Sequence, residues 1–500
     1  MHCRHGSEAF LIAGCSNSGK TTVMSMLMRS VFELDAPSPK ILYDPMAEML
    51  PVIYDLAGDS EDDARLGTGR VKVLNPFDVR GCAWSMSDID SPLAANQLAE
   101  VLVPQSGDDK EGRFYDEAVR SLVAGLAHSF IDCVPNPQSW TFRDLVLALT
   151  YEPYTRFMLE MDSTRGGNPF PVAAQLRKAY LQGDERVVSN IRATITTKFR
   201  NFAIIAACFH AAEREGRTFS LKEWAQQGGE GVLVVGNDDT AKETLETLNR
   251  AIFRRAFELL LALPGLTPEE LRSGAKRSWV FLDEVRNAGY LDKLSLLITK
   301  GRSRGICTAL AFQEIDGMRH EYGKELANEI CAQCGNVVVL RLNSGETAEW
   351  ASGMFGRGRG PSSGSNRSFD SQGNENRGRD EREEEQSYVD PAEFLYIPPT
   401  GPDTGLTGFA KSPDVNPDVH DLRIHLDWQT EVMPYLARRP SLPQDSWRAA
   451  RIQRPVSDQY LLPWGEEDWK RLGFTCPIPD WRGQRKPPES PPGPGGIPQL

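Results

Sequence analysis

The stretch Gly14-Cys15-Ser16-Asn17-Ser18-Gly19-Lys20-Thr21 fits the pattern G-x-x-x-x-G-K-S/T and decides the fold. An apolar run at 9–13 precedes it and a helix-forming run at 22–28 follows, so a strand, a glycine-rich turn and a helix occur in the required order. Backbone N–H groups of such a loop hold the β-phosphate, the lysine reaches the β and γ oxygens, and the threonine ligates Mg²⁺. We therefore expect ATP and Mg²⁺ to bind here, and the predicted nucleotide contacts are Gly14, Cys15, Ser16, Asn17, Ser18, Gly19, Lys20, Thr21 and Thr22.

A second apolar run, at 278–282, ends in Asp283-Glu284, which would supply the other half of an ATPase site. Asp283 would hold Mg²⁺ together with Thr21, and Glu284 would orient and polarise the attacking water. Gln313 follows the next apolar run, at 306–312, where its amide can report the γ-phosphate. An Asp-Glu pair after an apolar run is a weak signal alone, but the P-loop makes it a strong one.

The spacing of apolar residues divides the chain into regions. Strand and helix signals alternate at 1–91 and 203–356 and return at 388–411, which predicts an α/β domain with a mainly parallel central sheet. Helical periodicity prevails at 92–202 and predicts an inserted all-α domain. The glycine, serine and mixed charge of 357–387 predict a flexible loop. We expect 412–500, with its many prolines and scattered tryptophans, to be an irregular tail that packs in places and is disordered from about residue 485.

The net charge of −13 argues against a protein that coats nucleic acid with its whole surface, because phosphate binding needs a local excess of Lys and Arg. Basic residues, hydroxyls and aromatics interleave at 189–202, which makes Arg192, Lys198 and Arg200 candidate DNA contacts. A solvated amphipathic helix explains the same pattern equally well.

Two short clusters have the residue types of metal ligands. Cys331 and Cys334 have ligand spacing, but no second pair completes a tetrahedral site, so plain buried cysteines are the favoured interpretation. His2, Cys3 and His5 form another possible trio near the terminus. The chain has no run of about twenty apolar residues and no signal-peptide core, so we expect a cytoplasmic protein whose nine cysteines are mostly reduced.

An ordered series of motifs resembles the conjugative coupling proteins of type IV secretion systems (the TraG/TraD group), which are relatives of the FtsK/HerA DNA pumps. The resemblance runs from about residue 4 to about residue 411. Beyond the P-loop it rests on Tyr43-Asp44-Pro45 with Glu48, Leu74-Asn75-Pro76-Phe77, Phe114-Tyr115-Asp116-Glu117-Ala118, Phe281-Leu282-Asp283-Glu284, Gly301-Arg302-Ser303-Arg304-Gly305, Gln313, and Thr347-Ala348 ahead of Phe355-Gly356.

The resemblance implies a RecA-like ATPase that assembles as a homo-hexameric ring with DNA in its channel. It assigns water activation to Glu284, sensing to Gln313 and a trans-acting arginine finger to Arg302. The partners would be DNA and proteins of the secretion system or relaxosome. Members of the family usually begin with transmembrane helices, whereas this P-loop starts at Gly14. Contact with the inner membrane would then be peripheral and come through a partner, or be absent.

The leading hypothesis is an ATP-hydrolysing motor that delivers DNA to a type IV secretion channel. The alternative is an ATP-binding adaptor that recruits secreted proteins through its helical insertion and pumps no DNA. An inactive scaffold is a third interpretation, but it would show damage to Lys20, Thr21, Asp283 or Glu284, and all four are intact.

Overall fold

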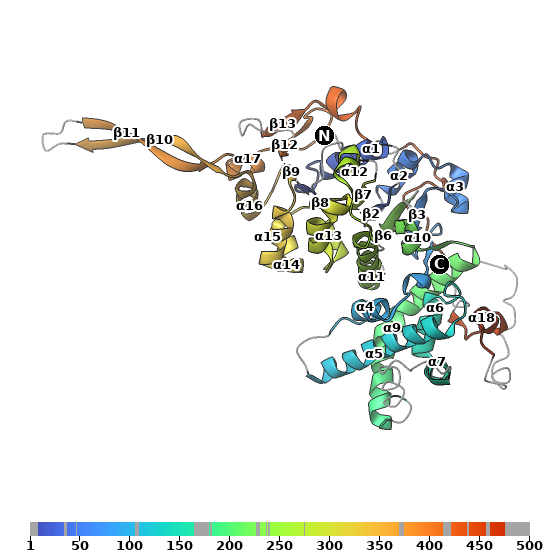
Figure 1. Ribbon diagram of the computed structural model, residues 1–500. Helices are drawn as coiled ribbons and strands as arrows, with labels where there is room; N and C mark the ends of the chain where they lie inside the picture. Colours follow the sequence, from blue (N-terminus) through green and yellow to red (C-terminus); the bar gives the residue numbers. More distant parts are fainter. Residues whose placement is uncertain are drawn as a thin grey trace, which may run out of the picture.

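The computed structural model describes most of the chain in three parts: a sheet covered by helices, a helical lobe and a long hairpin (Figure 1). The described residues are 9–475 except 35–37, 47, 106–109, 165–179, 181–182, 227–230, 237, 239–240, 275, 370–374, 414–421, 438–439 and 457–460.

The main sheet has nine strands in the order β13-β12-β9-β1-β8-β7-β2-β6-β3. The seven strands from β9 to β3 run parallel, while β12 and β13 add an antiparallel edge. This confirms the predicted α/β fold with a mainly parallel sheet. The strands are β1 (Phe10–Ala13), β2 (Lys40–Asp44), β3 (Val71–Leu74), β6 (Val232–Gly236), β7 (Ser278–Leu282), β8 (Ile306–Phe312), β9 (Asn336–Val339), β12 (Leu406–Lys411) and β13 (Arg423–Leu426).

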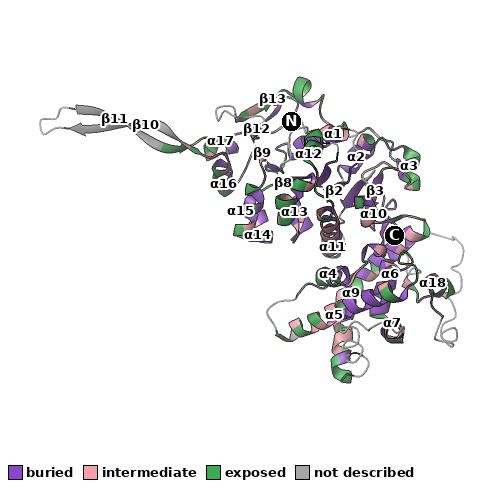
Figure 2. Cartoon of the chain, viewed as in Figure 1, coloured by how far each residue is buried: buried purple, intermediate pink, exposed green. Residues whose placement is uncertain are grey.

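Helices cover both faces of the sheet, so its central strands are buried along their whole length (Figure 2). Alternate residues of a strand point to opposite faces: Phe10 and Ile12 pack in one apolar cluster, and Leu11 and Ala13 in the other. The first cluster includes residues of α1 (Lys20–Phe32), α2 (Leu50–Ala57) and α3 (Glu61–Leu66). The second includes residues of α10 (Leu221–Gln226), α11 (Lys242–Leu261), α13 (Leu294–Gly301), α14 (Ile315–Tyr322), α15 (Lys324–Ala332), α16 (Gly345–Phe355) and α17 (Pro391–Leu395).

The helical lobe lies beside the sheet and contains most of the region predicted to be all-α (Figure 1). Its helices are α4 (Pro92–Leu102), α5 (Lys110–Cys133), α6 (Phe142–Thr150), α7 (Glu152–Thr164) and α9 (Glu185–Arg214), joined by α18 (Glu466–Arg471) from the tail. Strands β4 (Ala83–Trp84) and β5 (Thr218–Phe219) pair where the chain enters and leaves the lobe. The last lobe helix runs past the predicted boundary at 202, because Ile205 and Phe209 continue its buried face.

The structure differs from the expected flexible loop at 357–387. Strands β10 (Arg357–Phe369) and β11 (Glu375–Ser387) pair antiparallel from Arg357↔Ser387 to Phe369↔Glu375. Figure 1 shows this hairpin extending away from the sheet. Its strands are rich in glycine, serine and charge, so they lack the apolar alternation by which strands are recognised in a sequence.

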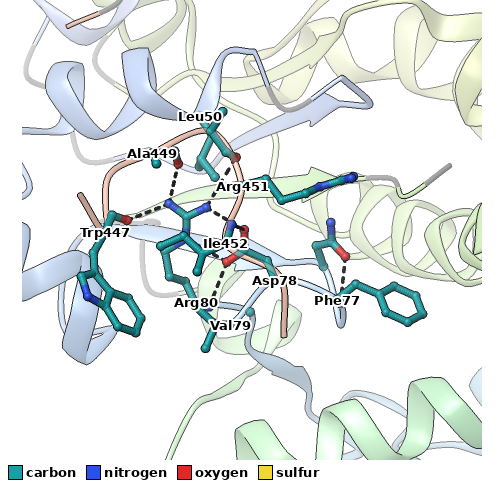
Figure 3. Close-up of polar contacts among 12 residues, drawn as sticks. Leu50, Phe77, Asp78, Val79, Arg80, Trp447, Ala449, Arg451 and Ile452 are labelled. Atoms are coloured by element: carbon teal, nitrogen blue, oxygen red, sulfur yellow. Dashed lines mark hydrogen bonds and ion pairs between the residues drawn. The ribbon is translucent and has the colours of Figure 1, made fainter. Parts of the chain in front are cut away.

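Parts of the tail pack against the rest of the chain and join the two bodies. Residues 447–454 lie against the turn after β3, where the guanidinium of Arg80 pairs with Asp78 at 2.6 Å (Figure 3). Arg80 also donates to the carbonyl oxygens of Trp447 (2.7 Å) and Ala449 (2.6 Å). In return, Arg454 donates to the carbonyl oxygens of Val79 and Gly81 and pairs with Glu215 at the end of α9. We call this contact of 78–81 with 447–454 the tail junction.

Farther along the tail, α18 and Trp464 are anchored on the helical lobe. Arg471 donates to both carboxylate oxygens of the buried Asp144, at 2.8 and 2.9 Å. The Trp464 ring stacks on Tyr154 with centroids 4.1 Å apart. The tail therefore bridges the sheet and the lobe. Its predicted disordered end, from about residue 485, lies outside the described residues.

Candidate nucleotide site

The P-loop connects β1 to α1 in a conformation that only a few residue types adopt. Asn17 has φ 58° and Gly19 has φ 100°, both in the left-handed region, where asparagine and glycine are the least strained. A Cβ atom on Gly14 would lie 2.3 Å from the Ser18 hydroxyl oxygen. The glycines of the motif therefore let the loop curl tightly at the start of α1, so that its backbone N–H groups can face one anion.

Lys20 lies under this loop and is almost fully buried. Its ammonium donates to the carbonyl oxygens of Gly14 (2.8 Å) and Cys15 (3.2 Å). It also lies 3.3 Å from Glu284 Oε1. The two halves of the predicted site, which are far apart in the sequence, thus meet at one place. Thr21 and Thr22 are half-buried in the first turn of α1.

The strand order explains this meeting, because β8 lies between β1 and β7 and the carboxyl ends of parallel strands share one edge. Gln313, which follows β8, donates from Nε2 to Glu284 Oε1 at 3.0 Å. On its other side its amide oxygen accepts a hydrogen bond from Ser16 Oγ at 3.4 Å. Glu284 has φ 54°, a strained backbone for this residue type. Its contacts with Lys20 and Gln313 fix the carboxylate beside the loop.

The carboxylates at this edge make the site strongly acidic. Burial, and then the negative charge of Glu284, raise the pKa of Asp283 to about 6, although Lys20 opposes the shift. Asp44, at the end of the neighbouring β2, has its pKa raised to about 7, mainly by burial. A divalent cation would relieve this crowding of negative charge, and carboxylate and hydroxyl oxygens are the ligands that Mg²⁺ prefers. The residues present therefore fit the predicted metal.

Asp44 also has a structural role. Its Oδ2 accepts the backbone N–H groups of Met49 (2.9 Å) and Leu50 (3.0 Å) at the start of α2. It is thus a strand-end anchor, and the negative charge of Asp283 adds to the rise in its pKa.

Arg302 is not at this edge. It is exposed and belongs to the 3₁₀ turn Arg302–Arg304 that precedes β8. It lines a surface hollow with Ala9, Ile306 and Gly335, which stand where β1, β8 and β9 begin. The P-loop lies at the opposite ends of the same strands, so Arg302 faces away from the nucleotide site of its own chain.

The three candidate DNA contacts lie on α9 in different surroundings. Arg192 pairs with Glu152 at 3.0 Å, and Lys198 pairs with the buried Asp116 at 2.8 Å. Arg200 is exposed. Two of the three cations are therefore already paired with carboxylates of the lobe. For Arg192 and Lys198 this agrees with the alternative interpretation of a solvated amphipathic helix.

Two residues that the sequence analysis did not single out contact the P-loop. Thr400, in the connection from α17 to β12, donates to the carbonyl oxygen of Ser18 at 2.6 Å. Arg341, just past β9, donates to Cys15 Sγ and to the carbonyl oxygen of Ser16, both at 3.3 Å. The sequence feature that could have identified Arg341 is a charged residue at the carboxyl end of a strand that flanks β1.

The candidate cysteine metal site has no support in the part of the chain that the structure describes. Cys331 and Cys334 are free and buried, and burial raises the pKa of the Cys331 thiol to about 12 and that of Cys334 further. Across the described residues, no group of three or more His, Cys, Asp or Glu side chains is arranged to hold a metal. His2, Cys3 and His5 lie outside the described residues.

Comparison with known proteins agrees with this geometry. Residues 1–414 match the family model of the type IV secretion-system coupling protein DNA-binding domain. The chain belongs to this family. The match confirms the resemblance drawn from the motifs. No curated protein matches the sequence.

Solved coupling-protein structures share the fold. The bacterial conjugative coupling protein TrwB in an unbound form matches with a TM-score of 0.60 and 18% identity, over 86% of this chain and 88% of that chain. TrwB with the ATP analogue ADPNP matches at 0.60 and 18%, and TrwB with ADP and Mg²⁺ at 0.57 and 18%, each over 85% of this chain and 86% of that chain. None of the helices in the described ranges is long and apolar enough to span a membrane.

Proposed function

We propose that this coupling protein is an ATP-hydrolysing motor that moves DNA toward a type IV secretion channel. The observation that carries the proposal is the 3.3 Å approach of Lys20 to Glu284, which joins the P-loop to the Asp-Glu strand end. The family match supplies the DNA-binding class. The TrwB structures that hold ADPNP or ADP with Mg²⁺ support nucleotide binding by this fold.

Each residue of the site would have a separate task during hydrolysis. The P-loop N–H groups and Lys20 would bind the β- and γ-phosphate oxygens, where the ammonium stabilises charge on the transferring group. Thr21 and Asp283 would hold Mg²⁺, which neutralises phosphate charge when bound. Glu284, oriented by Gln313, would accept a hydrogen bond from the attacking water. Gln313 would pass the state of the γ-phosphate to Ser16 and the loop.

A ring of subunits would complete the site. Arg302 lies on the far edge of the sheet from its own P-loop, so a catalytic role for this arginine requires a neighbouring chain. Homo-hexameric assembly would place one subunit's Arg302 against the next subunit's nucleotide. DNA in the channel and secretion or relaxosome proteins as further partners belong to the same proposal.

The test measures the ATPase rate against DNA concentration, beside the mass of the protein with and without nucleotide. We expect DNA to raise turnover and nucleotide to favour the assembled form. Glu284→Gln should bind ATP and turn it over at a rate near background. The matched control is Glu269→Gln, an exposed carboxylate on α12 (Pro268–Ser273). Turnover that is independent of DNA in the assembled protein would favour the adaptor function instead.

A further inference from the structure

Arg341 occupies a position at the P-loop that mirrors that of Gln313. Strand β1 pairs with β8 on one side and β9 on the other, with Ala13 opposite both Phe312 and Val339. Gln313 and Arg341 follow these two strands, and both contact Ser16. The backbone of Arg341 is also fixed, because its carbonyl oxygen accepts the N–H of Cys15 at 2.8 Å. The guanidinium therefore lies beside the first half of the loop.

The excess of carboxylates at the nucleotide site favours a further cation there. The negative charges of Glu284 and Glu48 both act on Asp283, and Lys20 is the cation that lowers the pKa of Asp283. Lys20 is already paired with Glu284. A nucleotide triphosphate adds further negative charge at the same place, and its γ-phosphate is the part that ADP lacks.

Arg341 is suited to meet that charge. In the part of the chain that the structure describes, its side chain contacts a thiol and a carbonyl oxygen, both neutral and both long at 3.3 Å. A guanidinium has five N–H donors, so most remain available, and the side chain is half-buried with access to solvent. Many other arginines of this protein are paired with carboxylates instead, as Arg319 is with Asp316 and Glu346.

We propose that Arg341 binds the γ-phosphate end of the nucleotide held by its own subunit. The proposal rests on the proposed function and adds to it a second cation in cis, distinct from the finger that Arg302 would extend to a neighbour. The guanidinium exchanges its contacts with Cys15 and Ser16 for charge-assisted hydrogen bonds to phosphate oxygens, which are shorter and stronger. It thereby distinguishes a triphosphate from a diphosphate.

The first test compares the affinities for ADPNP and ADP, each with Mg²⁺, in wild type and Arg341→Met. We expect the variant to lose about tenfold or more in affinity for ADPNP, the effect of one charge-assisted contact, and less than about twofold for ADP. Arg341→Lys should retain part of the ADPNP affinity. The control is Arg319→Met, which should leave both affinities unchanged.

An equal loss for both nucleotides would mean that Arg341 only shapes the loop, and no loss for either would also overturn the proposal. Arg341→Lys guards against misfolding of the Met variant, and the melting temperature of each protein is measured alongside. If Lys20→Ala also binds both nucleotides as wild type does, the nucleotide site itself is wrong. That outcome identifies a failure of the proposed function rather than of Arg341 alone.

A second test separates cis from trans action in mixed assemblies. In a ring of Arg302→Ala and Lys20→Ala subunits, an intact P-loop and an intact finger can meet at some interfaces, so turnover should recover. Arg341→Met mixed with Lys20→Ala should not recover, because both changes damage the site of the same chain. Recovery in the second mixture would show that Arg341 acts on a neighbour and would overturn the cis assignment.

Discussion

The nucleotide site and the tail junction both join distant parts of the chain, but only one of them is visible in the sequence. Lys20 reaches Glu284 at the nucleotide site, and Arg80 reaches the carbonyl oxygens of Trp447 and Ala449 at the tail junction. A loop that cradles phosphate needs glycine, lysine and a hydroxyl at fixed spacing. An arginine that binds backbone carbonyls needs no particular residue type on the other side.

The two regions also differ in what their polar groups do for the fold. Arg80 and Asp78 are 2% and 3% exposed and use their hydrogen-bonding capacity on protein partners. Glu284 keeps a strained backbone, and Asp283 and Asp44 have raised pKa values. Strain and crowded charge cost stability and are typical of functional sites. Changes in the two regions should therefore separate catalysis from stability.

The largest effect should come from Lys20→Ala, which removes the cation that we propose stabilises the transferring phosphoryl group. We expect the ATPase rate to fall by about 10²- to 10³-fold or to background. The melting temperature should change little, because Lys20 also contributes an ammonium that had to be buried. Lys324→Ala on the exposed start of α15 is the control. Substantial turnover in the Lys20 variant would break the assignment of the site.

Next in size is Arg80→Met at the tail junction, which leaves Asp78 buried without its ion-pair partner. Such a change costs about 3–5 kcal/mol in the free energy of unfolding. Denaturant unfolding followed by tryptophan fluorescence measures it, and ADPNP affinity should remain that of wild type. Arg65→Met, which breaks an exposed pair with Asp62, should cost less than about 1 kcal/mol. Equal stability of the two variants would show that the buried pair at the tail junction stabilises the protein no more than an exposed pair does.

The extent to which the sequence predicted the structure follows from the same contrast. The motifs implied that β1, β7 and β8 lie close together, because a P-loop, an Asp-Glu strand end and Gln313 can serve one triphosphate only if their strands are neighbours. The parallel sheet and the helical region followed from apolar periodicity. The positions of Lys20, Glu284 and Gln313 relative to one another agree with that expectation.

The hairpin, the tail and Arg341 could not be predicted in the same way. Strands β10 and β11 are held by backbone pairing and carry no apolar pattern. In the tail, Trp464 packs on Tyr154, which is far away in the sequence, and no local periodicity predicts such a contact. The sequence shows only that Arg341 follows an apolar run. Nothing in it specifies that the guanidinium contacts Cys15 and Ser16.

A smaller effect should appear in the pH dependence of metal binding. In the proposed site Asp283 would have to lose its proton to hold Mg²⁺, and its pKa is raised to about 6. Mg²⁺-dependent ADP affinity, measured by calorimetry, should therefore weaken as the pH falls from 7.5 to 5.5. Asp283→Asn should remove most of the metal dependence at both pH values. Metal-dependent affinity that stays constant across this range in wild type would contradict the role of Asp283.

The stability of the ligand-free protein should respond to pH with the opposite sign. The folded-state pKa values of Asp283 and Asp44 lie above that of an exposed Asp, so the folded form takes up protons more readily than the unfolded chain does. The contribution of these two groups is therefore fully present below about pH 4 and is lost as the pH rises to about 7. The Asp44→Asn variant should show a flatter profile of unfolding free energy between pH 5 and 7 than wild type.

The smallest effect should distinguish two arginines of α9. Arg200 is exposed, whereas Arg192 pairs with Glu152 and contacts the Tyr180 ring. If this helix tracks a phosphate backbone, Arg200→Gln should lower the salt slope of DNA affinity by about one, as expected for one lost phosphate contact. Arg192→Gln should change the slope less, because its cation is already neutralised within the lobe. Fluorescence anisotropy at several salt concentrations measures both slopes, and unchanged slopes in both variants would leave α9 with a structural role only.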